Sequence, residues 1–403
     1  MTYSTTYAGP MPTKVTSLNT PKSKSLTGTP LKHGFRFPAE WEPQSGTWFS
    51  WPRPEGISFP GKYHTVPENI CKIMHAIMQH GKQTVHINVP NENYERIVRG
   101  HLKDAKVPAE LIKKFIKFHF IATNESWCRD HGPAFVVSGS GSKSKFAIVD
   151  WGFNAWGGKY PPFDSDDAVP QRIADLYGQN KRFTGVFEPL HAKAAGEQVG
   201  KLRRVVMEGG GVEFNGKGTV LTTESCLLNK NRNPGLTKKQ IEQLLKDYYG
   251  QTNVCWLGEG IVGDDTDGHI DDLARFLDPQ TIVVAREADT KDANYELLEE
   301  NVRRCMELKD EKGDPFRIIA IPMPGNVSFD GQRLPATYLN FLFVNGACLV
   351  PTFRHKKHDK LALEILQNFL PNHKVVGVDC TELIWGLGAI HCLTQQVPAV
   401  AKL

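Results

Sequence analysis

Three side chains in two glycine-containing segments could together perform nucleophilic catalysis. His269 and Asp271 lie two residues apart, so in an extended backbone both side chains point to the same side. Near the other end of the sequence, Cys392 follows Gly386 and Gly388. A thiol that attacks and an imidazole that transfers protons would split a difficult substitution into two easier steps. An Asp that only orients a structural His is the non-catalytic alternative.

The choice of nucleophile and base stays open at this point. Cys128 is a rival to Cys392, because charged residues follow it directly. His391 is a poor base for Cys392, since neighbours on a strand point to opposite faces, and a more distant His is the better candidate. A buried apolar Cys with no chemical role is common in proteins and is the alternative for either thiol.

Further carboxylates lie next to tryptophan or glycine. Asp130 follows Trp127 at a predicted strand-to-turn junction, where an Asp can also cap its own turn. Glu208 precedes three glycines, which would let the backbone approach a ligand closely, although a tight turn with a solvated Glu has the same pattern. The loop 150–158 contains two Trp and three Gly, which suits either aromatic walls or packing.

Several familiar motifs are excluded. The G-x-G-x-x-G pattern at 258–263 is followed by three acidic residues within four positions, which would repel a pyrophosphate. The same loop does not fit an EF-hand, because neither terminal ligand position holds a suitable residue. No CxxC occurs among the eight cysteines, and no third ligand is evident beside His269 and Asp271. The sequence therefore gives little support for a zinc or iron–sulfur site, and dinucleotide binding at 258–263 is excluded.

One thiol, one imidazole and several carboxylates suggest a cationic substrate with an electrophilic carbon. A guanidinium fits this description, because it is planar, positive at ordinary pH and binds carboxylates through paired N–H groups. Only a few per cent of a free Cys is thiolate at pH 7, and a bound cation would raise that fraction. Electrostatics would then couple substrate binding to activation of the nucleophile.

Composition and charge exclude several classes of protein. The 403 residues are 40% hydrophobic and 23% charged, as in ordinary globular proteins. No run of eighteen apolar residues exists, which excludes a membrane span. Residues 1–39 carry five positive charges against +4 for the whole chain, so the remainder carries −1. A near-neutral body argues against binding of nucleic acid.

The sequence also predicts a domain organisation and a compartment. Residues 1–33 form a Ser/Thr/Lys-rich extension that we expect to be disordered, and residues 34–403 form a single catalytic domain. Sparse cysteines and the absence of a secretory signal pattern favour reduced thiols in the cytoplasm. Organelle targeting through the acid-free extension is a minor alternative.

Strand-like runs alternate with helical patterns along the chain, which is typical of an α/β fold. The predicted strands are 84–89, 118–122, 134–137, 146–150, 219–223, 281–285, 316–321 and 341–350. The predicted helices are 68–80, 238–249 with Thr237 as N-cap and Gly250 at the end, and 358–369. Residues 138–144 are expected to form a hairpin loop.

Seven segments, taken in order, resemble the agmatine deiminase branch of the guanidino-modifying enzymes. They are residues 39–44, 127–133, 150–158, 208–210, 221–234, 266–272 and 390–396. The resemblance implies a pentein fold, which is a five-bladed α/β propeller with pseudo-fivefold symmetry and an active site on the central axis. It also implies hydrolysis of a C–N bond in agmatine, giving N-carbamoylputrescine and ammonia for putrescine and polyamine biosynthesis, without metal or organic cofactor.

The resemblance also assigns roles to individual residues. It implies that Cys392 is the nucleophile, which forms a covalent amidino-thioether, and that His269 is the general acid and base. Asp130 and Asp271 would hold the guanidinium. A further set would contact the substrate or support these groups, namely Glu208, Trp127, Asp265 and Gly388.

Some positions depart from the family pattern. The loop before Cys392 contains Leu387 and Ala389 where a glycine run ending in Asn is expected, and Gly211, Glu213 and His131 replace Ser, His and Thr. An alternative function is therefore a related deiminase or amidinotransferase that acts on arginine, peptidyl-arginine or another guanidine. A non-enzymatic guanidine or polyamine binder is a third hypothesis. The expected partner is a small cationic guanidine, and the resemblance suggests a homo-oligomer.

Overall fold

The computed structural model describes residues 22–192 and 202–403. The predicted extension lies partly outside this range, since residues 1–21 are not described. Residues that follow are not separate from the fold: the Leu26 N–H donates to the Val186 carbonyl at 2.7 Å, and the Val186 N–H donates to the Lys24 carbonyl at 2.8 Å. The packed chain thus begins before the predicted boundary at residue 34.

Five sheets within the described residues repeat one pairing pattern. In each sheet a strand runs antiparallel to a second strand, and the second runs parallel to a third. In spatial order the sheets are β20 (Thr394–Pro398), β1 (Gln44–Ser50), β2 (Thr84–Val89) and β3 (Ile116–Phe120); β4 (Ala134–Ser138), β5 (Lys145–Val149) and β6 (Phe183–Phe187); β9 (Val212–Phe214), β10 (Thr219–Thr223) and β11 (Asn253–Leu257); β12 (Ala274–Asp278), β13 (Thr281–Arg286) and β14 (Arg317–Pro322); and β17 (Leu342–Val344), β18 (Ala347–Thr352) and β19 (Lys374–Asp379).

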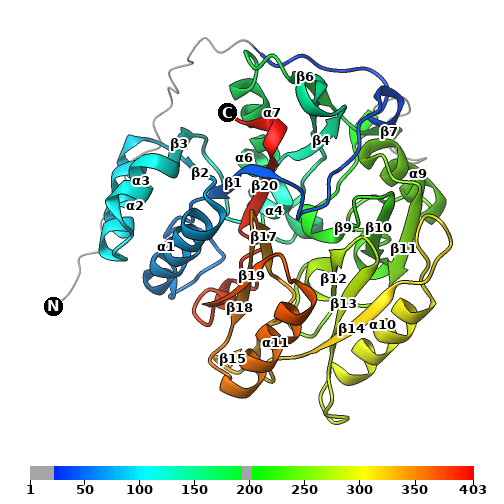
Figure 1. Cartoon of the computed structure of the whole chain (residues 1–403). Helices are drawn as coiled ribbons and strands as arrows, with labels where there is room; N and C mark the ends of the chain where they lie inside the picture. Colours follow the sequence, from blue (N-terminus) through cyan, green and yellow to red (C-terminus); the bar gives the residue numbers. More distant parts are fainter. Residues whose placement is uncertain (1–21, 193–201) are drawn as a thin grey trace.

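Helices connect the parallel strands, as parallel pairing requires a crossover. Figure 1 shows the helices α1, α2, α10 and α11 on the outside of the molecule, with β9, β12, β17 and β20 toward its middle. The longer helices are α1 (Val66–Ala76), α2 (Glu92–Asp104), α3 (Ala109–Phe115), α7 (Val169–Leu176), α9 (Lys238–Tyr249), α10 (Tyr295–Glu307) and α11 (Lys356–Phe369). Short helices and ribbons complete the fold: α4 (Cys128–His131), α5 (Ala155–Gly158), α6 (Asp164–Asp167), α8 (Glu224–Leu227), β7 (Leu190–Ala192) with β8 (Leu202–Arg204), and β15 (Ser328–Phe329) with β16 (Gln332–Arg333).

Helix α9 forms where the sequence predicts it. Its N-terminus is a capping box, in which the Thr237 side chain accepts from the Gln240 N–H and the Gln240 side chain accepts from the Thr237 N–H. Gly250 ends the helix in the left-handed conformation with φ 66°. Ile241 and Leu245 lie on its buried face, so the helix packs its apolar side inward.

Other predicted boundaries differ. The run 341–350 was expected as one strand but forms the hairpin β17–β18, because Asn345 and Gly346 make the turn and Gly346 has φ 74°. The helix predicted at 68–80 starts at Val66 and becomes a π-helical turn at Ile77–Gly81. The hairpin loop at 138–144 is confirmed between β4 and β5.

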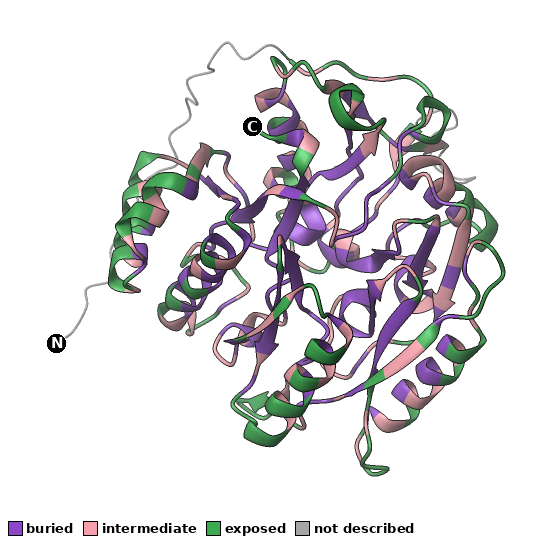
Figure 2. Cartoon of the chain, in the orientation of Figure 1, coloured by how far each residue is buried: buried purple, intermediate pink, exposed green. Residues whose placement is uncertain are grey.

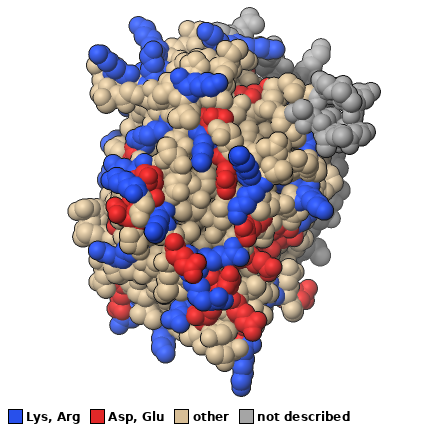
Figure 3. Space-filling view, turned by 90° about the vertical axis from the view of Figure 1, so that its right-hand side faces the viewer, with Lys and Arg blue, Asp and Glu red and all other residues tan. Residues whose placement is uncertain are grey.

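The two ends of the described fold meet in one sheet, where Thr47 of β1 pairs with Gln396 of β20. Figure 2 shows the strands mostly buried and the outer faces of the helices exposed. On the face drawn in Figure 3, basic and acidic side chains are interspersed across its middle and lower parts. Within the described residues, no helix is long and apolar enough to span a bilayer.

Candidate active site

A cavity of about 230 Å³ opens beside the loop that precedes β20. Five of the predicted site residues line it, namely Trp127, Asp130, Asp265, Gly388 and Cys392. Three aromatic side chains also line the cavity, namely Trp156, Tyr160 and Trp385. Trp156 comes from the loop 150–158, for which aromatic walls were one of the two interpretations. The other predicted residues are fully buried next to this lining: His269 borders Asp130, Asp271 borders Cys392, and Glu208 borders His269.

Cys392 lies at the cavity with a defined hydrogen-bond donor. Its Sγ is 3.0 Å from Nδ2 of Asn340 and 3.8 Å from Oδ2 of Asp271. The orientation of the Asn340 amide is fixed, because its Oδ1 accepts from the backbone N–H groups of His391 at 3.0 Å and Cys392 at 3.2 Å. The amide nitrogen must therefore face the sulfur. No motif marks Asn340 in the sequence, and its position only becomes evident in space.

The surroundings of Cys392 favour the neutral thiol. Burial, together with the carboxylates of Asp271, Asp272 and Asp130, raises the pKa of Cys392 well above its usual range, while the Asn340 hydrogen bond lowers it. A cation placed among these carboxylates would offset their effect on the sulfur. The coupling of cation binding to thiol activation that the sequence predicts is consistent with this arrangement.

Asp130 is held from two directions on the short helix α4. Its Oδ1 accepts from the Gly210 N–H at 3.0 Å, and its Oδ2 accepts from Nε1 of Trp156 at 2.9 Å. Burial raises the pKa of Asp130 to about 6, although the neighbouring His269 opposes the shift. Trp156 reaches Asp130 from a strained backbone with φ 55°, and Ala155 before it has φ 52°. The strained loop thus aims an indole N–H at a carboxylate.

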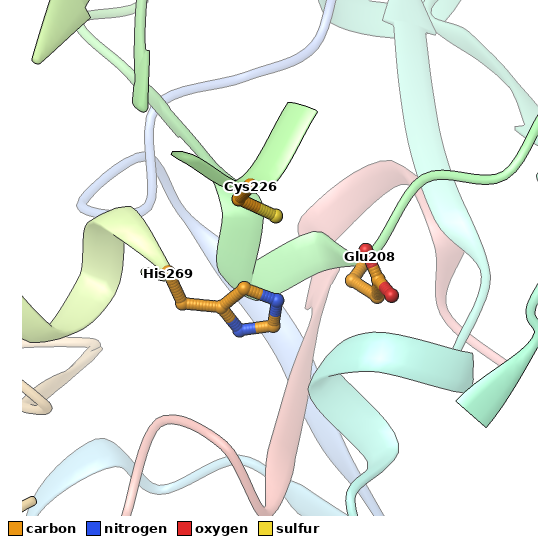
Figure 4. A group of neighbouring side chains, drawn as sticks. All are labelled: Glu208, Cys226 and His269. Carbon is orange, nitrogen blue, oxygen red and sulfur yellow. The ribbon is translucent and has the colours of Figure 1, made fainter. Parts of the chain in front are cut away.

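His269 is fully buried beside Asp130. Its Nδ1 lies 3.7 Å from Oδ1 of Asp130, and neither ring nitrogen has a hydrogen-bond partner within the part of the chain that is described. Burial opposes protonation of the ring, but Asp130 and the adjacent Cys226 outweigh it and hold the pKa of His269 well above its usual range. Figure 4 shows the ring close to Cys226 and Glu208. The imidazolium is therefore available as a proton donor.

The segment that carries His269 and Asp271 is not an extended strand. His269 has extended dihedral angles, but residues Ile270–Asp272 form a 3₁₀ turn. The expectation that the two side chains share one side of a strand was therefore wrong. Asp271 instead turns toward Cys392: its Oδ2 accepts from Nδ1 of His391 at 2.7 Å and from Nδ2 of Asn340 at 3.3 Å. Its Oδ1 has no partner in the described chain.

Glu208 is a buried ion-pair partner and not a solvated turn residue. Its Oε1 accepts from Nε of Arg232 at 2.9 Å, and both side chains are 0% exposed. Arg232 also donates to Asp267 and to the Thr266 carbonyl. Arg232 lies in the segment 221–234 that carries the family resemblance, but its role is visible only in the structure.

The structure shows the surroundings of two further predicted site residues, Asp265 and Gly388. Asp265 accepts from Nζ of Lys159 at 3.2 Å and from the Tyr160 hydroxyl, so its carboxylate is already paired. Gly388 touches Trp127 directly: a Cβ at this position would lie 2.5 Å from Cζ3 of the indole. A glycine is required there for the loop to pass the ring.

The rival nucleophile lies in a different environment. Cys128 is 0% exposed within a hydrophobic cluster, and burial raises its pKa to about 12. It does not line the 230 Å³ cavity. The geometry favours Cys392 over Cys128.

Two groups of side chains could hold a cation, although the sequence showed no third ligand. Glu208, Cys226 and His269 form one group, and Asp271, Asp272 and Cys392 form the other, with ligand atoms within 4.8 Å of one another in each. Third ligands that are distant in sequence cannot be recognised before folding. The first group already holds Arg232 against Glu208, which disfavours a second cation there.

Comparison with known proteins decides the family. The chain matches the Porphyromonas-type peptidyl-arginine deiminase family over residues 36–398. The protein belongs to this family. It is 35% identical to the agmatine deiminase of Ectopseudomonas mendocina over 398 residues, which covers 93% of this chain and 98% of the relative. It is also 35% identical to the agmatine deiminase of Medicago truncatula, covering 93% and 99% of the two chains.

The solved structures agree. The agmatine deiminase of Enterococcus faecalis superposes with a TM-score of 0.79 at 32% identity, covering 94% of this chain and 99% of that one. This deiminase-family member therefore has the α/β fold of that enzyme.

Proposed function

We propose that this protein is an agmatine deiminase, which hydrolyses agmatine to N-carbamoylputrescine and ammonia. The observation that carries the proposal is the cavity lined by Cys392 and Asp130, with Asp271 buried against Cys392 and His269 packed against Asp130. The relatives with the stated 35% identity are named for the same activity. The product would feed putrescine and polyamine synthesis.

The proposal includes the finer description of the fold. Five sheets with one pairing pattern, each with peripheral crossover helices, are what five propeller blades would require. We infer that each sheet is one blade of a pentein propeller formed by a single domain, with the cavity near the axis. A homo-oligomer and a cytoplasmic location are expected as well, and light scattering on the purified protein tests the first of these.

Substrate binding would use the two carboxylates that face the cavity region. Asp271 has one oxygen without a partner, and Asp130 is presented by Trp156 and Gly210. A guanidinium donates paired N–H groups to such carboxylates, which would place its carbon next to Sγ of Cys392. Glu208, which lies beside His269 and is paired with Arg232, would support the position of the imidazole.

The reaction would then proceed in two halves. The Cys392 thiol loses its proton to solvent as the cation binds, and the thiolate attacks the guanidinium carbon and forms a C–S bond. His269 donates a proton to the leaving nitrogen, the C–N bond breaks to release ammonia, and an amidino-thioether remains. His269 next removes a proton from water, whose oxygen attacks the same carbon. Cleavage of the C–S bond releases the ureido product and returns the thiol.

The walls of the cavity suit a substrate that is cationic at both ends. Its described lining contains no Lys or Arg, so nothing there would bind the α-carboxylate of free arginine. The rings of Tyr160 and Trp385 would instead receive the primary amine of agmatine, and Asp265 would join them by exchanging its contact with Lys159 for one with the amine. This composition disfavours the alternative of an arginine deiminase or amidinotransferase.

The test is ammonia release from agmatine, arginine and an arginine-containing peptide, measured side by side. We expect turnover of agmatine only, loss of that turnover in Cys392→Ala, and near-normal activity in the matched control Cys128→Ala. Mass spectrometry of quenched enzyme should detect the covalent adduct on Cys392. Turnover of arginine or the peptide would reassign the substrate, and full activity in Cys392→Ala would exclude the mechanism.

A further inference from the structure

A buried chain of charged groups lies behind Asp271 and has no part in the reaction described above. His391 is 1% exposed and lies between two carboxylates. Its Nδ1 is 2.7 Å from Oδ2 of Asp271, and its Nε2 is 2.7 Å from Oε2 of Glu40. The three side chains come from residues that are 120 and 351 positions apart in sequence, so the contact exists only in the folded protein.

The contacts determine which groups hold the ring. Asp271 and Glu40 both have a lowered pKa, in spite of burial, because His391 and Arg275 lie beside them. Both are therefore carboxylates, which can only accept hydrogen bonds. Nδ1 of His391 therefore donates to Asp271, while Nε2 lies 2.7 Å from Oε2 of Glu40 and 3.2 Å from Nη2 of Arg275.

Glu40 holds the side of the His391 ring that faces away from Asp271. Its Oε1 accepts from the Phe343 N–H at 2.7 Å, and its Oε2 also accepts from Nη2 of Arg275 at 3.0 Å. Arg275 is itself fixed by the carbonyl groups of Leu339 and Phe341. Glu40 and Arg275 hold the His391 ring, and the backbone around β17 in turn holds Glu40 and Arg275. The position of the ring is thus set by the fold and not by groups that line the cavity.

The contact with His391 fixes one carboxylate oxygen of Asp271 and leaves the other without a partner in the part of the chain that is described. Oδ2 is held by His391 and Asn340, while Oδ1 has no partner in the described residues. We propose that His391 is a positioning residue, which holds the ionised Asp271 with Oδ1 directed to the guanidinium of the substrate. This inference rests on the proposed function, and it gives His391 a role other than that of a base for Cys392.

Two substitutions separate the two contacts of the ring. His391→Asn retains an amide nitrogen close to the position of Nδ1, so it preserves the donor to Asp271 and removes the one to Glu40. His391→Gln places its amide nitrogen near the position of Nε2 and does the reverse. Gln is also closer to His in volume, so a residue that merely fills space should tolerate Gln better than Asn.

Steady-state kinetics with agmatine provide the main measurement. We expect KM to rise about tenfold or more in His391→Gln, with a smaller change in kcat, because the lost contact positions a ground-state binding group. His391→Asn should keep KM within about threefold of the wild type. The double variant Asp271→Asn with His391→Gln should have the same kcat/KM for agmatine as Asp271→Asn alone, since both substitutions act on the same contact. Equal KM values in the Asn and Gln variants, or additive losses in the double variant, would overturn the role.

A second measurement requires no turnover. Millimolar guanidinium chloride should slow alkylation of Cys392 by iodoacetamide in the wild type and in His391→Asn, but far less in His391→Gln, because the bound cation blocks access to the sulfur even though it favours the thiolate. If the wild type fails to release ammonia from agmatine, the proposed function is wrong, and this protection assay still tests His391. Equal protection in both variants would contradict the positioning role by itself.

Discussion

The backbone of Gly210 lies directly against the imidazole of His269. A Cβ at position 210 would lie 2.5 Å from Nδ1 of His269 and 2.9 Å from Oδ1 of Asp130. We therefore predict that Gly210→Ala displaces the proposed general acid and lowers kcat/KM for agmatine by about a hundredfold or more, since misplacement by about 1 Å is that costly. The melting temperature should change by only a few degrees.

Gly211 supplies the matched control for this prediction. A Cβ there would first meet Sγ of Cys226 at 3.5 Å, which is an ordinary contact. Gly211→Ala should retain most of the activity. If Gly210→Ala and Gly211→Ala were equally active, His269 would not need its present position for the reaction.

Asn340 should control the reactivity of the nucleophile. Its amide donates to Sγ of Cys392, and hydrogen bonds to charged groups contribute about 1.5–3 kcal/mol. Asn340→Ala should therefore slow alkylation of Cys392 by iodoacetamide about tenfold at pH 8, and Asn340→Asp should slow it further by adding a negative charge. The rate of alkylation across pH provides the measurement. An Asp variant that reacts as fast as the wild type would disprove this account of the thiol.

Activity should fall in acid because Asp130 becomes protonated. Its pKa is raised to about 6, so the carboxylate that attracts the guanidinium is lost as pH falls through that value. Trp156→Phe removes the indole N–H that stabilises the charged form, so the pKa should rise and the acid limb of kcat/KM should move to higher pH. Trp385→Phe is the control, because that indole donates to the Pro60 carbonyl and not to Asp130.

The ion pair between Glu208 and Arg232 should be essential for stability. Both side chains are 0% exposed, and removal of one member of a buried pair costs about 3–5 kcal/mol. Arg232→Leu should lower the free energy of unfolding by about that amount in urea titrations. The double variant Glu208→Gln with Arg232→Leu should recover a substantial part of the loss. A single variant as stable as the wild type would mean that water solvates Glu208.

The fold was predictable where local signals are strong. The boundaries of α9, β2 and β10 agree with the sequence analysis, because a capping box or a short β-rich run specifies each one locally. Helix α10 was not predicted, since its buried positions are separated by charged residues along the sequence. The segment 341–350, which was predicted as one strand, forms a hairpin. Apolar residues on both sides of its two-residue turn gave the pattern of a single continuous strand.

The site was predictable only in part, for a different physical reason. Trp127, Asp130, Asp265, Gly388 and Cys392 line one cavity, and the resemblance had named all five. Asn340 and Arg232 act through contacts across 52 and 24 positions of sequence, and no local pattern marks such partners. The loop 150–158 was a candidate for aromatic walls, but the contact of Trp156 with Asp130 across 26 positions was not predicted. The fine geometry of His269 and Asp271 was wrong because a 3₁₀ turn replaces the expected strand.

The pairing of β20 with β1 has a consequence for protein synthesis. Cys392 immediately precedes β20, which joins a strand made some 350 residues earlier, at residues Gln44–Ser50. A nascent chain that has not yet passed residue 392 therefore possesses neither its thiol nor its closing strand. Chains that stall on the ribosome or lose this last segment to a protease should be inactive, so only molecules that have been translated through both ends of the fold can consume substrate.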